Sequence, residues 1–249
     1  MLRFYPYIIL LFCFNFQLRA QFLTFNQKNE LIVQQRIILE NNVAGVINSN
    51  NFFVNGVKYK TKYSPALHPF FEDDKWIDGK IIYRNHPIDV RGLRYDIVND
   101  ELVYLNIHQN EIYPIILTPA FTQDFYIYNH HFRFLNITAR NSDNIIKTGY
   151  YEIIHDGNTK FYVKWEKYSY MNEVEHQLEM KIRKTLYIYN ANEYSKIKNK
   201  RKLIGVLKDK KKEVKDFIRK EKINFSKVNY ASSDAILKFY DSLKNDDDN

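Results

Sequence analysis

Cysteine, glycine and proline are scarce in this 249-residue chain, which has 1 Cys, 7 Gly and 6 Pro. A single cysteine excludes a disulfide scaffold, and so few glycines exclude collagen-like and glycine-rich fibres. The chain has no glycine-rich phosphate loop, no Gly-x-Ser-x-Gly elbow and no His-Glu-x-x-His metal motif. No class of enzyme is therefore indicated by a catalytic motif, and we expect no cofactor and no bound metal.

Apolar and aromatic residues are abundant instead. Hydrophobic residues make up 45% of the chain and aromatic residues 16%, with 20 Tyr and 18 Phe. A disordered chain lacks this apolar content, and the length suits one large or two small domains with a real core. The formal charge is +8, from 37 Lys and Arg against 29 Asp and Glu. Lys, Asn, Ile, Tyr and Phe are residues of AT-rich codons, so part of this charge reflects codon composition.

The first twenty residues predict a secretory signal peptide, cleaved after Ala20. Arg3 supplies a short positive region. Residues 4–16 form an apolar run that is shorter than the ~20 residues needed to span a bilayer. The bulky Leu and the Arg just before Ala20 are unusual at a cleavage site, and a retained membrane anchor is the alternative.

Cleavage at this point would change the chemistry of the chain. It removes Cys13 and two arginines, so the mature chain has no cysteine and a smaller positive charge. No later apolar run reaches the ~18 residues of a transmembrane helix. We therefore expect an exported protein that is periplasmic, associated with the outer membrane or extracellular.

The remaining chain divides into a β-rich domain at 21–198 and a C-terminal helical segment at 199–244 that packs on it. Residues 245–249 are polar and acidic, and we expect a disordered tail there. Near the start of the β-rich domain, the apolar pattern of residues 27–40 fits a helix and a strand equally well.

Strand patterns dominate from residue 51 onward. Asn55-Gly56 stands between apolar residues, which is the strongest short signal for a β-hairpin. From 76 to 117, strands recur about every ten residues between short polar turns, as in an antiparallel meander. In the second block of hairpins, from 125, Gly157 is expected to adopt a positive φ in its turn. Pro114 should place its strand at an edge or interrupt it.

Helical patterns end the chain. Asp209 can cap a helix over 210–222, whose expected buried residues are Val214, Phe217 and Ile218. Another helix is predicted to follow from about Ser232. The sequence thus predicts a mainly β protein, an antiparallel meander, sandwich or curved sheet with two or three C-terminal helices.

Three blocks resemble uncharacterised exported proteins of the Bacteroidetes. They are Trp76-x-x-Gly79 with Leu93-x-Tyr95-Asp96-Ile97-x-Asn99-Asp100-Glu101-Leu102-Val103, then Gly149–Tyr168, and then Lys211–Lys220 with Tyr240–Leu243. The resemblance covers most of the chain after residue 20. It implies export and no particular activity.

An acidic stretch beside a tryptophan is the first candidate binding site. Glu72-Asp73-Asp74 precedes Trp76, and this group can bind a cation or stack a sugar ring. The alternative is an acidic loop before a strand whose Trp enters the core.

A charged turn is the second candidate. Asp96, Asp100 and Glu101 lie close to Arg94 in the sequence, and a glycosidase needs two facing carboxylates. The alternative is that Asp100 shapes the turn and Asp96 pairs with an Arg. Across both candidates, the proposed ligand-binding residues are Glu72, Asp73, Trp76, Arg94 and Asp96.

Two neighbouring histidines and a basic run complete the candidates. His130 and His131 project to opposite faces if they lie on a strand, which argues against a shared metal. Residues 196–222 carry 13 Lys and Arg against 4 acids. Such a run attracts phosphates, with Lys210, Lys211 and Lys212 as the contact candidates, or it is a solvated helical face.

Three functions are consistent with this sequence. The first is a non-enzymatic envelope protein that binds a partner protein, a lipid or a glycan. The second is an exported hydrolase whose Asp, Glu and His residues come from dispersed positions. The third is a peripheral contact with an anionic membrane surface through the basic run. Export argues against nucleic acid as a partner.

Overall fold

The computed structural model describes residues 56–247 apart from 62, 65–66, 109–110, 138–144 and 224–229. The expected signal peptide, the segment 27–40 and most of the Asn55-Gly56 hairpin lie outside these residues. Within the described part of the chain, no helix has both the length and the apolar character needed to cross a membrane.

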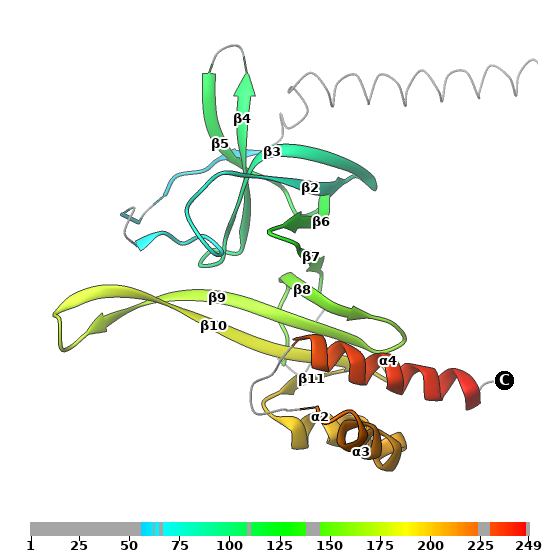
Figure 1. Ribbon diagram of the computed structural model, residues 1–249. Coiled ribbons are helices and arrows are strands. Elements are labelled where there is room, and N and C mark those ends of the chain that lie inside the picture. Colours follow the sequence, from blue (N-terminus) through cyan, green and yellow to red (C-terminus); the bar gives the residue numbers. More distant parts are fainter. Residues whose placement is uncertain are drawn as a thin grey trace, which may run out of the picture. The chain divides into compact units, whose positions relative to one another are not determined.

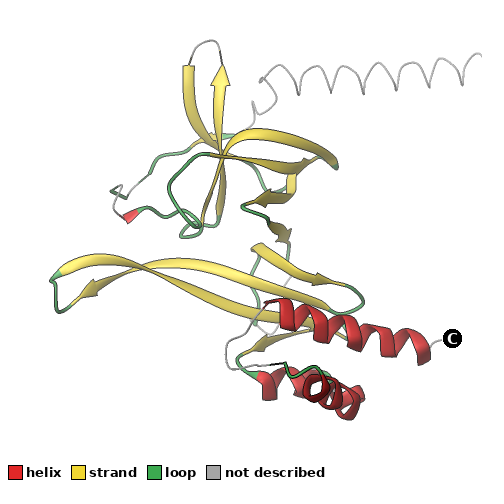
Figure 2. Cartoon of the chain, viewed as in Figure 1, coloured by secondary structure: helices red, strands yellow, loops and turns green. Residues whose placement is uncertain are grey.

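One antiparallel sheet of eleven strands makes up most of the described chain, and three α-helices follow it (Figures 1 and 2). The mainly β fold with C-terminal helices is therefore confirmed. The strands in sequence order are β1 (Val57–Lys58), β2 (Ile77–Tyr83), β3 (His86–Asp96), β4 (Glu101–His108), β5 (Glu111–Ile116), β6 (Thr122–Ile127), β7 (His130–Leu135), β8 (Gly149–Asp156), β9 (Lys160–Asn172), β10 (Gln177–Asn190) and β11 (Glu193–Ile197).

The sheet consists of two meanders, which are joined where β6 pairs with β2. Strands β2 to β5 are consecutive neighbours, and β1 pairs with the outer side of β5. The chain then returns so that β6 pairs with β2, and β6 to β11 are again consecutive neighbours. Pro114 lies in β5 opposite Leu105 of β4, just before the two residues that pair with β1. Its carbonyl accepts the Tyr59 amide on the outer side of β5, at 2.9 Å, so its missing N–H also faces that side and removes no hydrogen bond to β4.

Three hairpins use two-residue turns with the same backbone. Both central residues have positive φ at Arg84-Asn85, Tyr128-Asn129 and Ala191-Asn192. This is the type I′ geometry, whose twist matches that of paired strands. Asparagine stands second in each turn and tolerates the left-handed conformation better than most residues.

Gly157 differs from the sequence-based expectation. Its φ is not among the positive values of the described glycines, which are those of Gly92 and Gly149. A Cβ at Gly157 would instead collide with Oδ2 of Asp241, which lies in the C-terminal helix. Glycine is needed here because another side chain approaches the backbone closely.

Aromatic rings fill the core of the sheet. Phe71 is 1% exposed and packs edge-on against Trp165 and Phe132, with ring centroids 4.8 and 5.2 Å away. Phe125 stacks on Phe132 at 4.8 Å, and Tyr95 packs edge-on against both. Such pairs add to the stabilisation from area burial alone.

The helices are α2 (Lys200–Val206), α3 (Lys211–Lys220) and α4 (Tyr230–Asp247), with a short 3₁₀ turn, η2 (Lys208–Lys210), before α3. Helix α3 buries Val214 and Ile218, as predicted, whereas Phe217 is only half-buried and stacks on Phe239 of α4.

The expected cap of α3 is wrong, because Lys210 occupies the N-cap position, and no side-chain hydrogen bond caps the helix there. The carboxylate of Asp209 instead accepts a hydrogen bond from the Tyr240 hydroxyl, at 2.8 Å. Helix α4 continues to Asp247, into the stretch where we expected a disordered tail.

Candidate functional site

Arg94 lines a cavity of about 290 Å³ together with several aromatic side chains, among them Tyr59, Phe70 and Trp76. Arg94 is in β3, and Trp76 immediately precedes β2. The register of these two strands pairs Ile77 with Leu93, so Trp76 and Arg94 come next to each other across the hairpin. The Arg94 guanidinium carbon is 4.1 Å from the centroid of the Trp76 ring and 4.8 Å from that of Phe70.

The guanidinium of Arg94 has no acidic partner among the residues that the structure describes. Its Nε atom is buried and has no hydrogen-bond partner there. Burial lowers the pKa of Arg94, and the nearby charge of Asp74 opposes this shift. An arginine remains protonated even so. The site therefore holds a partly desolvated cation whose described contacts are ring faces.

Contacts with the surrounding chain fix the aromatic side chains that line the cavity. Tyr59, Phe70 and Val103 form a small buried cluster against which Trp76 packs. Phe70 is placed by an isolated bridge to Asp96, and Tyr59 by a hydrogen bond from its amide to the carbonyl of Pro114. These contacts fix the rings before any ligand arrives, which reduces the entropy cost of binding.

Asp96, one of the predicted binding residues, is fully buried and shapes the chain around the cavity. One carboxylate oxygen accepts the amides of Val98 and Asn99, both at 2.9 Å, and the other accepts the Tyr59 hydroxyl at 3.0 Å. As the alternative to ligand binding, we expected Asp96 to pair with an arginine. The structure shows a tyrosine and turn amides as its partners instead. Burial and the Asp96 charge raise the pKa of Tyr59, so this phenol remains a donor.

Of the acidic stretch, Asp74 lines the cavity, whereas Glu72 and Asp73 do not. Glu72 is exposed, with a left-handed φ of 58°. Asp73 accepts the Tyr128 hydroxyl at 2.6 Å and the Lys75 amide at 2.9 Å. These hydrogen bonds, that from Tyr128 first, lower the pKa of Asp73 to about 2. Asp73 thus stabilises the loop that carries Asp74 and Trp76.

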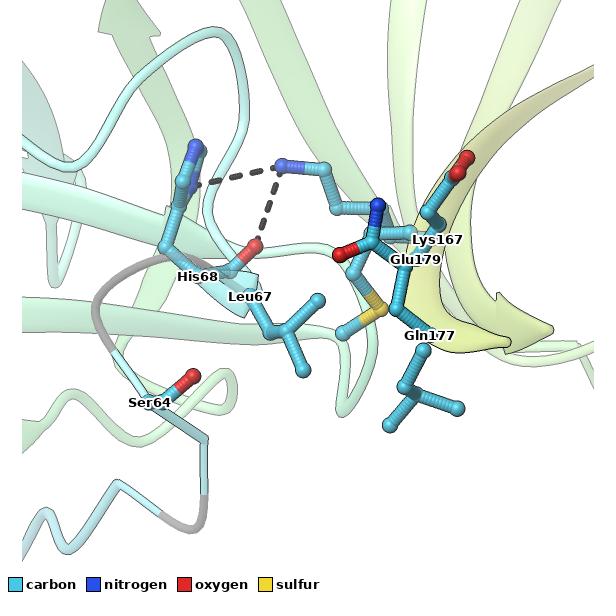
Figure 3. Close-up of a pocket in the computed structure, with 8 residues that line it drawn as sticks. Ser64, Leu67, His68, Lys167, Gln177 and Glu179 are labelled. Carbon is cyan, nitrogen blue, oxygen red and sulfur yellow. Dashed lines mark hydrogen bonds between the residues drawn. The ribbon is translucent and has the colours of Figure 1, made fainter. Parts of the chain in front are cut away.

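Figure 3 shows a second hollow, of about 640 Å³. It lies next to the first, because Ser64 and His68 line both. Lys167 of β9 reaches into it, and its amine donates to the carbonyls of Phe70 and His68 at 2.7 and 3.1 Å. The His68 Nδ1 atom lies 3.3 Å from the same amine. Burial and the Lys167 charge lower the pKa of His68. With three partners, the Lys167 amine ties β9 to residues 68–70 and is not available as a nucleophile.

Histidine–carboxylate pairs test the hydrolase hypothesis. Glu152 is buried between His130 Nδ1, at 2.5 Å, and the Trp165 indole N–H, at 2.6 Å. Both are core contacts, since His130 and Trp165 also pack on Phe71. His131 projects away from this cluster, and its Nε2 atom lies 2.6 Å from Asp124. The two neighbouring histidines thus have separate partners.

His155 has carboxylates at both ring nitrogens. Nδ1 is 2.9 Å from Asp234 and Nε2 is 3.0 Å from Asp241. A serine nucleophile would need one of these nitrogens as its base. Both are already used to join β8 to α4. Across the described ranges, no three His, Cys, Asp or Glu side chains are grouped closely enough to hold a metal ion.

The basic candidates differ in their surroundings. Lys211 and Lys212 are exposed in the first turn of α3, whereas Lys210 is half-buried in η2. Helix α3 buries its apolar face and leaves these lysines on the outer one.

The sequence therefore pointed to Trp76 and Arg94 and missed Tyr59, Phe70 and His68. Those three residues come from segments whose pairing is long-range, and only their aromatic character marked them. No family model, curated protein or solved structure matches this chain.

Proposed function

We propose that this chain is a non-enzymatic binding protein whose ligand is a small organic carboxylate with an apolar body. The carboxylate would pair with Arg94, and the apolar body would fill the cavity against Phe70 and Trp76. Export is part of the proposal and is supported by the signal-like residues 1–20 and by the Bacteroidetes resemblance.

A single observation carries the proposal: the Arg94 Nε is buried without an acceptor beside an aromatic cavity. A buried donor without a partner costs free energy, about 1–3 kcal/mol and more for a charged group. A ligand carboxylate can accept from the guanidinium in a bidentate arrangement and remove this cost. Without a ligand, the faces of the Trp76 and Phe70 rings stabilise the guanidinium cation.

The experiment compares ligands that differ only in charge. Indole-3-carboxylate and octanoate would be titrated into the protein by calorimetry, each beside its neutral amide. We expect each carboxylate to bind at least about tenfold more tightly than its amide, because only the carboxylate forms an ion pair with Arg94. The Arg94→Gln variant should lose this preference.

Arg91→Gln is the matched control, because Arg91 is exposed on the same strand and does not line the cavity. It should bind like the unmodified chain. If neither carboxylate binds more tightly than its amide, or if Arg94→Gln retains the preference, the proposed function is wrong.

A second function, contact with an anionic membrane surface, is favoured by the exposed Lys211 and Lys212. Each lysine near such a surface contributes about 1 kcal/mol. This contact would hold the protein at the envelope without occupying the cavity.

A further inference from the structure

Strand β10 has a long free edge. Residues 186–190 pair with β11, whereas Gln177–Thr185 pair only with β9 among the described strands. The β9–β10 hairpin therefore extends as a two-stranded ribbon beyond β11 (Figure 1). A free edge presents unpaired backbone N–H and C=O groups that can pair with another strand.

This edge lacks two of the features that protect edge strands, a proline and a β-bulge, although four of its nine residues are charged. It contains no proline, and its register with β9 is continuous over all nine residues. Apolar side chains along it remain in solvent, since Leu178 is 45% exposed and Ile182 is 46% exposed. Met171, directly opposite Leu178 on β9, is 59% exposed.

The two faces of β10 differ in character. Leu178, Met180 and Ile182 share one face, because alternate residues of a strand point to the same side. Glu179, Lys181 and Arg183 share the other, with charges that change sign along the strand. Tyr170 and Asn172 donate to Glu179 across the hairpin, which holds its carboxylate on this face.

We propose that two copies of the chain pair antiparallel through β10, with the two-fold axis at Met180. In this register Leu178 lies opposite Ile182 of the second copy, so apolar residues meet on one face. Glu179 lies opposite Lys181 of the second copy, twice by symmetry, so opposite charges meet on the other face. Cross-strand pairs of these kinds stabilise a sheet, and like charges destabilise it.

The neighbouring registers are worse. An axis at Lys181 places two lysines directly opposite each other, and an axis at Glu179 does the same for two glutamates. Of these three registers, only the one with its axis at Met180 brings opposite charges together.

The backbone of β10 fits the same register. The type I′ turn at Ala191-Asn192 makes Asn190 and Glu193 a hydrogen-bonded pair, so the backbone groups of Asn190 point toward β11. Counting back along the uninterrupted register, Leu178, Met180 and Ile182 also point their backbone groups to this outer side. These are the residues that would exchange N–H···O=C bonds in the proposed pairing.

Charge reversal tests the proposal in the full chain. The unmodified chain should show a concentration-dependent monomer–dimer equilibrium in sedimentation velocity. Glu179→Lys and Lys181→Glu should each weaken dimerisation by about tenfold or more, because two like-charged pairs replace two opposite ones. The double variant should regain the unmodified affinity.

Mixing the two single variants gives the sharpest result. A Glu179→Lys chain and a Lys181→Glu chain present opposite charges to each other at both pairs, so the mixture should form a heterodimer that neither variant forms alone. Association through any other segment would not depend on these two charges. Glu173→Lys, in the exposed turn of the same hairpin, is the matched control and should dimerise normally.

A disulfide tests the position of the axis. Residues opposite each other at the axis have Cα atoms about 5.5 Å apart, which suits a disulfide. Met180→Cys in a Cys13→Ser background should therefore form a covalent dimer on mild oxidation. A chain that stays monomeric at its highest soluble concentration, single variants that dimerise like the control, or a mixture without heterodimer would each overturn the proposal.

Discussion

The Nε2 atom of His155 lies 3.0 Å from Oδ2 of Asp241, and this contact joins the end of β8 to the C-terminal helix α4. The same aspartate accepts the backbone amide of Thr159 at 3.1 Å. Asp234, seven residues earlier in the same helix, contacts the other ring nitrogen of His155. It also forms an ion pair with Lys238, at 2.8 Å. The helix is thus attached to the sheet by charge-assisted hydrogen bonds as well as by apolar packing.

Asp241→Ala should lower the free energy of unfolding by about 3 kcal/mol. The substitution leaves His155 Nε2 and the Thr159 amide buried without an acceptor, which costs more than the bonds contribute. Urea denaturation followed by circular dichroism measures the change. Glu213→Gln, exposed on α3, is the control and should stay within about 0.5 kcal/mol of the unmodified chain.

Two glycine substitutions should have opposite effects. Gly157→Ala should destabilise the fold, because the new Cβ would collide with Asp241 and lie 2.7 Å from His155 Nε2. Gly205→Ala in α2 should stabilise it by about 0.5–1 kcal/mol, because the new Cβ would have no atom within 4 Å apart from neighbouring residues and the backbone of its own helix, and alanine favours helix. Thermal unfolding of the two variants distinguishes these cases. Equal melting temperatures would contradict the close approach described for Gly157.

Tyr128→Phe should raise the pKa of Asp73. The Tyr128 hydroxyl is the main cause of the low pKa, about 2, against an ordinary value of 3.8. Because the folded pKa lies below the unfolded one, ionised Asp73 stabilises the fold above about pH 4, and this stabilisation is lost as the pH falls toward 2. Carbon-detected NMR of the Asp73 carboxyl measures the midpoint directly. An unchanged midpoint in Tyr128→Phe would show that the hydroxyl is not the cause.

Replacing Lys210, Lys211 and Lys212 together by serine should weaken binding to vesicles that contain phosphatidylglycerol. We expect a loss of at least about tenfold, since each lysine contributes about 1 kcal/mol near an anionic surface. Co-sedimentation with vesicles measures the effect. The same substitution at Lys58, Lys75 and Lys80, which are exposed on other parts of the chain, is the control. Equal binding by the two triple variants would exclude a specific role for the basic run.

Local sequence patterns were sufficient to predict much of the fold. Strand spacing and turn residues indicated the meander, and the apolar spacing of Val214 and Ile218 indicated α3. The asparagine in each type I′ turn is a local signal of the same kind. These features depend on residues that are close in the sequence, so they can be predicted from one sequence alone.

The candidate site was predictable only in part. Trp76 and Arg94 arose as separate candidates, and their contact depends on the register of β2 with β3. Phe70 and Tyr59 reach the cavity through a bridge to Asp96 and a bond to Pro114, which no periodicity encodes. Asp96 was proposed as a ligand-binding residue because it is charged, but its bonds to Tyr59 and to turn amides give it a place in the scaffold.

The chain has two tryptophans, and they lie in different surroundings. Trp165 is 4% exposed, bonded to Glu152 and enclosed by Phe71, whereas Trp76 lines the cavity under the Arg94 guanidinium. The fluorescence of each tryptophan can therefore be measured separately in a variant that lacks the other. In a Trp165→Phe chain the emission reports occupancy of the cavity, and in a Trp76→Phe chain it reports unfolding of the core, so ligand entry and global opening can be timed independently without an added dye.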